Sequence, residues 1–373
     1  MTTLAARTHT GVDASPEDAH TALLEAAAEH AAAVDRGERP AFTTLAEHGG
    51  TALTLGRGDT ATAGDLREQV AVLRATGARC LSTAFSLWGH RMGVEYLDAA
   101  GAPLPEGVET GAVPLSSAMA PLFKSAAGLG EVSVVGTPLP DGGLRLEGRM
   151  PWASNLLPDG EVLLPVRLEE GGAAAGGSEA TAGPALAVVR VATDDPRLSV
   201  RLLSGLTALE ATASGSLALD GVQVGPERVL TRDAAALRER VTTPFLAFQS
   251  AFCLGLCEAS LAASAEFLAG PESAVFADDH AALSRELEEL TTRLEAVAAA
   301  PAEASRRELV RLRLAAAHLT GSTTTLERRV AGGRGFALRS ATSRRVREAE
   351  FLPVQSPTEG HLRVLLGRLE QAG

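Results

Sequence analysis

The sequence has almost no lysine, one tyrosine and few cysteines, and these scarcities narrow the class of protein. Lys124 is the only lysine among 34 basic residues, and 46 acidic residues leave a net charge of −12. A chain this acidic is poorly suited to the phosphate backbone of nucleic acid or to an anionic membrane surface. Aromatic residues make up only 3%, but hydrophobic residues make up 45%, enough for a large core over 373 residues. We expect a globular protein that binds no nucleic acid and no membrane.

The cysteines and the most apolar segment also indicate in which cellular compartment the protein is expected. Cys80, Cys253 and Cys257 are too few and too scattered for a disulfide framework or a structural zinc site. No apolar run of a secretory signal follows the N-terminus. The uncharged stretch 241–257 contains Pro244 and is shorter than the roughly 20 residues that span a bilayer, so we expect a buried helix there. The sequence predicts a cytoplasmic protein with no metal site.

The chain changes character twice, which predicts an α+β fold of three parts. The Ser-Pro-Glu-Asp segment at 15–18 supplies an N-cap, a first-turn proline and first-turn acids, so a helix begins there. Residues 1–127 are expected to form an N-terminal helical domain. Residues 128–232 are expected to form a middle β-barrel or β-sandwich domain, and residues 233–373 a C-terminal four-helix bundle.

The hydrophobic periodicity predicts the individual elements. Turn residues at 140–143 between short apolar runs favour a β-hairpin, and the Gly/Ala-rich segment 171–183 is expected to be a loop. Strands are expected at Val132–Val135, Leu144–Gly148, Glu161–Leu168, Ala185–Val191, Leu198–Leu203 and Gly215–Val224. Helices are expected at Ala63–Thr76, Ala78–Ala99, Pro114–Ala127, Leu237–Ala269, His280–Ala298, Ala304–Val330 and Thr358–Leu369.

Four local patterns follow one another along this α–β–α chain. The first is GGLRLEGRMPWASN at 142–155, a hairpin followed by a Trp-x-Ser stretch, and the second is LDGVQVGPERVL at 219–230. The third is the GGRGF turn at 332–336, and the fourth is RRVREA and the helix that follows it, within 344–368. Taken in this order, the four patterns resemble the acyl-CoA dehydrogenase family of flavoproteins, and the second is similar to the strand that closes the β domain of that family.

The resemblance implies a cofactor, FAD or FMN, held between the β domain and the helical bundle. It implies that Trp152 and Ser154 lie against the flavin ring. Subunits of the family pair, so a homodimer or homotetramer is expected. Glycines also allow a backbone to approach a phosphate, although a helix C-cap explains a Gly-rich turn equally well. The residues expected at the phosphate end, across a subunit boundary, are Arg329, Gly332, Gly333, Arg334 and Gly335.

The sequence departs from the family at the catalytic base. Most members carry a carboxylate two residues before the threonine that matches Thr358, and Ser356 stands there. Another branch takes its base from an earlier helix, near Phe245, where 241–257 contains no acid. Ser273 occupies the position of an arginine that grips the FAD pyrophosphate in the family. Weakened cofactor contacts are therefore expected, and a partner reductase could supply reduced flavin.

Other acid–base groups become candidates once the carboxylate is lost. His90 lies on a helix that borders the substrate cavity in oxygen-using relatives, and Glu359 and His361 follow Ser356 on the terminal segment. Each of these histidines could donate a proton or orient a substrate, and each could equally be structural. We expect His90, Ser356, Glu359 and His361 to line the substrate cavity.

Together these features predict a flavin-dependent oxidoreductase of the monooxygenase or oxidase type. Its substrate is expected to be a small or carrier-tethered metabolite. One alternative is an acyl-thioester dehydrogenase with a relocated base, Glu359 or Glu210. The other is a protein that keeps the fold without flavin, for binding or for non-redox chemistry.

Overall fold

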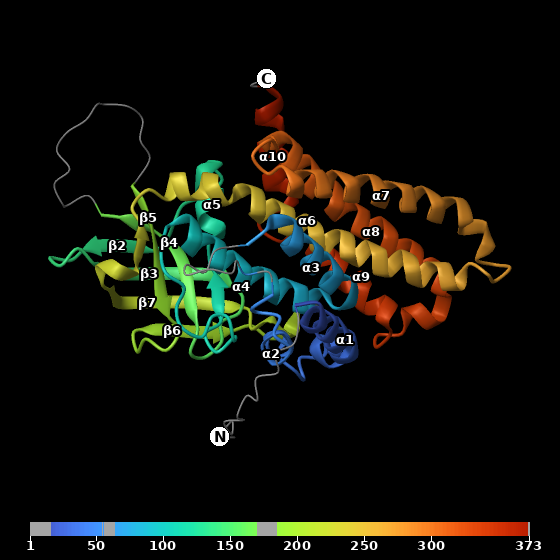
Figure 1. Cartoon of the computed structure of the whole chain (residues 1–373), viewed down its shortest axis with the longest axis horizontal. Coiled ribbons are helices and arrows are strands. Elements are labelled where there is room, and N and C mark those ends of the chain that lie inside the picture. The colour runs from blue at the N-terminus through green and yellow to red at the C-terminus, as the bar shows by residue number, and fades with distance from the viewer. Residues whose placement is uncertain (1–15, 54, 56–63, 170–184, 372–373) are drawn as a thin grey trace.

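The computed structural model describes residues 16–53, 55, 64–169 and 185–371. The segment 171–183, predicted to be a loop, lies outside these residues. Two bodies lie side by side in Figure 1, a β-sheet and a bundle of long helices, with α4 passing from one to the other. The N-terminal helices are α1 (Pro16–Asp35), α2 (Ala41–Glu47), α3 (Leu66–Arg79), α4 (Leu81–Ala99) and α5 (Ala120–Ala126).

The strands form one sheet in the described part of the chain. It runs in the order β6-β7-β3-β2-β4-β5-β8, with β1 also paired to β4. Neighbours are antiparallel, apart from the parallel pairs β1–β4 and β2–β4. The strand bounds are β1 (Leu115–Ser117), β2 (Val135–Pro138), β3 (Leu144–Ala153), β4 (Glu161–Leu168), β5 (Leu186–Ala192), β6 (Leu198–Leu202), β7 (Gly215–Val224) and β8 (Val229–Thr231).

The C-terminal part is helical, and α6 is its central element. By length and composition α6 could cross a membrane, yet 83% of its most apolar window is buried inside the protein. This agrees with the buried helix expected over 241–257. The helices are α6 (Ala234–Phe267), α7 (Ala277–Ala299), α8 (Arg306–Phe336), α9 (Ala341–Phe351) and α10 (Glu359–Gln371), and the short 3₁₀ turns are η1 (Glu210–Thr212), η2 (Pro226–Arg228) and η3 (Ala274–Phe276).

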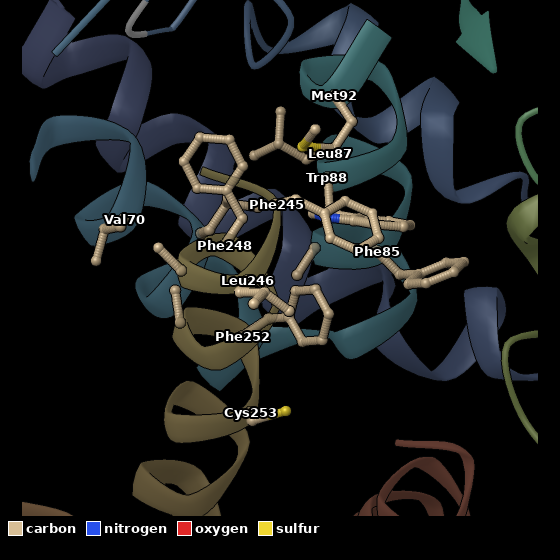
Figure 2. Close-up of a cluster of buried hydrophobic side chains, with 14 of the residues drawn as sticks. Val70, Phe85, Leu87, Trp88, Met92, Phe245, Leu246, Phe248, Phe252 and Cys253 are labelled. Atoms are coloured by element: carbon tan, nitrogen blue, oxygen red, sulfur yellow. The ribbon is translucent and has the colours of Figure 1, made fainter. Parts of the chain in front are cut away.

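Aromatic side chains join α4 to α6. Phe85 stacks on Trp88 with 5.1 Å between ring centroids, and Trp88 lies 5.8 Å from Phe245 and 6.3 Å from Phe252. Figure 2 shows these rings between the two helices. Every residue of α4 from 81 to 97 is buried, so over this length the helix has no face exposed to solvent. A helix that is closely packed on every side is a rigid support for the elements that contact it.

Several elements differ from the sequence prediction. The strand expected at Val132–Val135 is shifted to Val135–Pro138 (β2), and β8 was not predicted. Residues 115–117, expected to be helical, form β1 and pair with β4. The helices α2 and α9 were not predicted as separate elements. In the three residues of β1, pairing with β4 outweighs the local helix propensity. This pairing is a tertiary contact, so no local sequence pattern indicates it. Pro353 and Pro357 lie between α9 and α10, where the chain leaves the helical conformation, and the terminal helix expected at Thr358–Leu369 is α10.

A fully buried arginine fixes the chain between α9 and α10. Arg313 of α8 is 0% exposed and has no acidic partner among the described residues. Its Nε donates to Gln249 Oε1 (2.9 Å), and its Nη2 donates to the carbonyl of Leu352 (2.9 Å) and to Gln355 Oε1 (3.2 Å). The Nε2 of Gln249 in turn donates to the carbonyl of Ser356 (2.9 Å). The guanidinium and the amide thus hold 352–356 against the bundle.

We predict that Gln249→Leu lowers the free energy of unfolding by about 2–4 kcal/mol, because it leaves a buried guanidinium without one acceptor. Urea unfolding measures the change. The matched control is Gln371→Leu, at an exposed glutamine of α10, with an expected change of less than about 0.5 kcal/mol. Equal effects of the two substitutions would contradict the role given to Gln249.

Candidate functional site

A cavity of about 280 Å³ lies where the sheet meets α4 and α9. Four separate segments enclose it: α4, the end of β3, the turn that leads into β7, and α9 with the short stretch that follows it. Aromatic and aliphatic side chains form most of its wall. The lining residues are Phe85, Trp152, Leu206, Thr207, Ala208, Leu209, Thr212, Ser214, Arg347, Glu350, Phe351 and Val354.

Trp152 reaches the cavity because β3 carries a bulge. The β3–β7 register passes from Met150↔Leu217 to Ala153↔Gly215, so β3 has one residue more than β7 there. Bulges of this kind redirect side chains and are common beside functional sites. Trp152 is 43% exposed, which is unusual for so large an apolar side chain. An exposed indole in a concave wall is suited to stacking on a flat ligand.

Asn155 fixes the end of β3 onto α4. Its backbone has a φ of 59°, and its Nδ2 donates to the carbonyls of Ser86 (2.7 Å) and Leu115 (3.3 Å). Gly89 permits this approach, since a Cβ there would lie 3.0 Å from the same Nδ2. The stretch that carries Trp152 and Ser154 is therefore anchored to the rigid helix of the core.

Three buried hydroxyl groups at the cavity wall are connected in a row by hydrogen bonds. Ser154 Oγ lies 2.7 Å from Ser214 Oγ, and Ser214 Oγ lies 2.8 Å from Thr212 Oγ1. Thr212 Oγ1 donates to the carbonyl of Leu209 (2.8 Å). Thr212 and Ser214 line the cavity, and Ser154 is buried beside them. The sequence singled out Ser154 but not the two hydroxyls that lead into β7.

Arg347 closes the cavity on the side of α9. Its guanidinium pairs with Asp35 of α1 (2.6 Å) and donates to the carbonyl of Thr207 (2.9 Å). Its Nε is buried with no acceptor among the described residues. Glu210 holds the same loop from beneath, because its carboxylate accepts from the backbone N–H groups of Gly205 (3.0 Å) and Leu206 (2.8 Å). Glu210 is thus committed to its own loop and does not line the cavity.

Glu350 is the only carboxylate among the residues that line this cavity, and the sequence analysis missed it. It lies exposed at the end of α9 and also lines a groove of about 760 Å³ between α7, α8 and α9. His318, Arg328 and Arg329 line that groove. The cavity and the groove therefore meet at Glu350. Arg328 and Arg329 therefore give the groove two cationic groups in its wall.

His90 lies in the core and does not line the cavity. Its Nδ1 accepts a hydrogen bond from the backbone N–H of Leu115 (3.1 Å), and its ring packs edge-on against Phe42 at 5.2 Å. Burial and the neighbouring Arg91 lower the pKa of His90 to about 3. A neutral, enclosed imidazole of this kind supports the β1–α4 contact and cannot serve a ligand in the Trp152 cavity.

Ser356, His361 and Glu359 also lie outside the Trp152 cavity. Ser356 Oγ is buried without a partner among the described residues, and its peptide bond to Pro357 is cis. His361 lines a separate cavity of about 70 Å³ beside Phe245, and burial, followed by Lys124 and Arg368, lowers its pKa. Glu359 pairs with His318 and Arg363, and hydrogen bonds from both lower its pKa.

The glycine-rich turn ends α8, away from the Trp152 cavity of the same chain. Gly332 has a φ of 58° and interrupts the helical backbone, and a Cβ at Gly335 would lie 2.7 Å from Ala331 Cβ. Arg334 lies over the ring of Phe267 at 5.2 Å. Ser273, in the position of the family's arginine, donates to the carbonyl of Val330 (3.3 Å). Within the described chain the turn does not reach Trp152, and its predicted phosphate contact stays a prediction.

We predict that His90 makes the protein less stable in acid. Its folded pKa of about 3 lies below the ordinary value of 6.5, so stability present above pH 6.5 is lost as pH falls toward 3, by up to about 1.4 kcal/mol per pH unit. His90→Gln has no proton to gain and should flatten this slope between pH 6.5 and 4.5 in urea unfolding. Glu95 on the same helix has a pKa raised to about 7 by burial and gives the opposite slope in both proteins.

The control for that slope is His318→Gln, at a side chain that is 48% exposed. It should leave the acid slope within about 0.3 kcal/mol per pH unit of the original. A His90→Gln protein with the same slope as the original would contradict the buried neutral histidine.

The chain matches no protein-family model and no curated protein sequence. Solved structures do match over nearly its whole length. TdsC from Paenibacillus sp. A11-2, in complex with FMN and indole, is 16% identical with a TM-score of 0.74, over 92% of this chain and 95% of that one. Butyryl-CoA dehydrogenase from Megasphaera elsdenii is 14% identical with a TM-score of 0.78, over 96% and 100%.

A third match is glutaryl-coenzyme A dehydrogenase in complex with glutaryl-CoA, at 16% identity and a TM-score of 0.75, over 98% of this chain and 97% of that one. TdsC is described as a dibenzothiophene monooxygenase. At these identities the comparison establishes the fold and not the activity. It confirms the fold class that the sequence motifs predicted: this chain is a divergent protein with the acyl-CoA dehydrogenase-like fold.

Proposed function

We propose that this protein is a flavin-dependent oxidoreductase of the monooxygenase or oxidase type, acting on a small or carrier-tethered metabolite. The observation that carries the proposal is the cavity beside Trp152, which has a flat apolar wall, hydroxyl groups and one arginine. A bound flavin supplies hydride or electron transfer and, when reduced, reaction with O₂. The residues of this chain bind the ring and enclose it.

The residues present fit a flavin ring. Phe85, Trp152 and Phe351 give the cavity aromatic walls, and Phe85 and Phe351 meet edge-on at 5.3 Å. The hydroxyl oxygens of Thr212 and Ser214 lie in the wall, where they can meet polar atoms at the edge of a ring. About 280 Å³ is near the lower limit of ligand pockets, roughly 300–1,000 Å³. The cavity therefore suits a ring system, and a phosphate tail would have to lie outside it.

The monooxygenase type rests on the chemistry of the cavity wall. Desaturation of a thioester needs a carboxylate that removes the α-proton. Ser356 stands at the usual position of that base, and Phe245, at the other, is stacked on Phe123 with 4.3 Å between ring centroids. An enclosed ring without a buried base is suited to oxygen chemistry on a substrate that needs no α-proton removal. Reduced flavin would then come from a partner reductase.

We also propose a cytoplasmic homodimer or homotetramer. Val275, Phe336 and Leu338 are each more than 70% exposed. They lie at the end of the bundle that holds the glycine-rich turn, where Ser273 contacts the last turns of α8. Exposed apolar side chains in such a group are typical of an interface. The pairing would bring the turn at Gly332 to the cofactor of a partner subunit.

We predict that the purified protein binds FMN or FAD and that Trp152→Ala weakens the binding about tenfold, because an aromatic stacking contact contributes about 1–1.5 kcal/mol. Quenching of flavin fluorescence measures the dissociation constant. The control is Leu202→Ala, at an apolar residue that is 54% exposed on β6 and outside the cavity. Failure of the original protein to bind either flavin would favour the alternative of a flavin-free protein on the same fold.

Desaturation by a relocated base remains a second candidate because of Glu350. Glu210 and Glu359, the relocated bases suggested by the sequence, are held by their loop and by His318 and Arg363. Glu350 instead lines the cavity itself and forms no ion pair among the described residues. A carboxylate at the cavity mouth could reach a thioester that enters from the adjoining groove.

Anaerobic mixing of the flavin-loaded protein with acyl-CoA thioesters separates the two candidates. We expect no bleaching of the flavin absorbance without a reductase, because no buried carboxylate faces the cavity. Bleaching that falls at least ~10²-fold in rate in Glu350→Gln, but not in the control Glu359→Gln, would instead identify Glu350 as the base of a dehydrogenase.

A further inference from the structure

The three hydroxyl groups behind the cavity wall form a chain with a fixed direction. Thr212 is 1% exposed, Ser214 4% and Ser154 8%, so each must satisfy its hydrogen within the protein. Within the described residues, the one acceptor for these hydroxyls outside their own group is the carbonyl of Leu209, in contact with Thr212, so all three hydrogens are satisfied only if Thr212 donates to it. Thr212 can therefore only accept from Ser214, 2.8 Å away, and Ser214 can then only accept from Ser154, 2.7 Å away.

This direction determines what the wall offers to a ligand. All three hydrogens are used along the chain from Ser154 through Ser214 to Thr212 and on to Leu209. Of these residues, Thr212 and Ser214 line the cavity, and they present oxygen lone pairs without a free hydrogen. The part of the cavity wall that leads into β7 therefore offers a ligand acceptors and no donor.

The two redox forms of a flavin differ in the hydrogen-bonding property that this wall can distinguish. Nitrogen N5 of the oxidised ring is an acceptor, and the two-electron-reduced ring carries a hydrogen there. An oxidised ring edge against Thr212 and Ser214 would bring acceptor against acceptor. A ring edge that carries hydrogen would satisfy both lone pairs, and burial makes such a mismatch costly.

We propose that Thr212, acting through Ser214, makes this cavity select the reduced flavin over the oxidised one. The inference rests on the proposed flavin site and deepens it. Thr212 is a specificity-determining residue because its hydroxyl takes the hydrogen of Ser214, which otherwise would be free to donate into the cavity. The preference for reduced flavin depends on the direction in which the three hydroxyl groups donate their hydrogen bonds, and not on how many hydroxyl groups there are.

Thr212→Val tests this direction, because valine has nearly the same shape and cannot accept. The hydrogen of Ser214 is then released, and Ser214 can donate to an oxidised ring or to Ser154. Thr212→Ser is the matched control, since it keeps the hydroxyl and its bond to the carbonyl of Leu209. Ser214→Ala is a second variant, should Thr212→Val fold poorly, because it removes from the cavity wall one oxygen that can only accept.

The experiment measures dissociation constants for FMN under anaerobic conditions, oxidised and after reduction with dithionite, for the original protein and the three variants. We expect the original protein and Thr212→Ser to bind reduced FMN at least about tenfold more tightly. For a two-electron couple that ratio corresponds to a midpoint potential of bound flavin raised by about 30 mV. In Thr212→Val and Ser214→Ala the ratio should fall at least about fivefold, mainly through tighter binding of the oxidised form.

The outcomes separate this inference from the proposed function. Binding of neither form by the original protein would overturn both. Equal binding of the two forms, or a ratio in both Thr212→Val and Ser214→Ala that matches the original, would overturn the role of Thr212 and leave the flavin site standing. A ratio that also collapses in Thr212→Ser would show that the site depends on the shape of threonine and not on the direction of its hydrogen bond.

Discussion

A single buried cation organises the part of the molecule on which the site depends. Arg313 lies wholly inside the helical bundle, and neutral acceptors, Gln249 Oε1, Gln355 Oε1 and the carbonyl of Leu352, surround it. Desolvating a guanidinium is costly, so these acceptors must stay in place. They fix the chain directly after α9, and α9 supplies Arg347 and Phe351 to the cavity. The position of α9, which forms the cavity wall opposite the sheet, thus depends on contacts inside the helical bundle.

The opposite wall is held by a different kind of contact. Asn155 ties the end of β3 to α4, and Glu210 and Arg347 hold the loop before β7 from two sides. Neither segment would enclose a ligand alone, because each contributes one face. The cavity exists only where the sheet, α4 and α9 meet. This explains why its chemistry, a flat aromatic surface beside directed hydroxyls, comes from residues far apart in the sequence.

Much of the fold could be predicted from the sequence. The strands β4 and β7 have the predicted bounds, because alternation and flanking turns mark them, and α6 is recognisable from its long apolar run. Of the Trp-x-Ser stretch, Trp152 lines the cavity and Ser154 is buried beside it, and their predicted contact with a flavin stays a prediction. The strand β1 could not be predicted, because its only cause is pairing with β4. Likewise, α9 was hidden because its apolar face is short and its surface is rich in arginine.

The site itself was less accessible from the sequence. The sequence placed His90 on a helix expected to border the substrate cavity. Only the structure shows that this side chain is buried and that its ring accepts a hydrogen bond from the backbone of Leu115. Glu350, Thr212 and Ser214 carry no motif, and Thr212 and Ser214 precede β7, so no strand periodicity marks them. Arg347 belonged to a recognised pattern without a role. Its contacts with Asp35 and Thr207 are tertiary, and no local spacing reports them.

The central claim is that a flavin ring lies between the sheet and α9, against Trp152. A crystal structure of the protein grown with FMN tests it most directly. The account predicts density for the three-ring system in the cavity bounded by Trp152, Thr212 and Phe351, with the indole stacked on its face. Ring density at another place, or side chains of the same chain filling this cavity at saturating FMN, would contradict it.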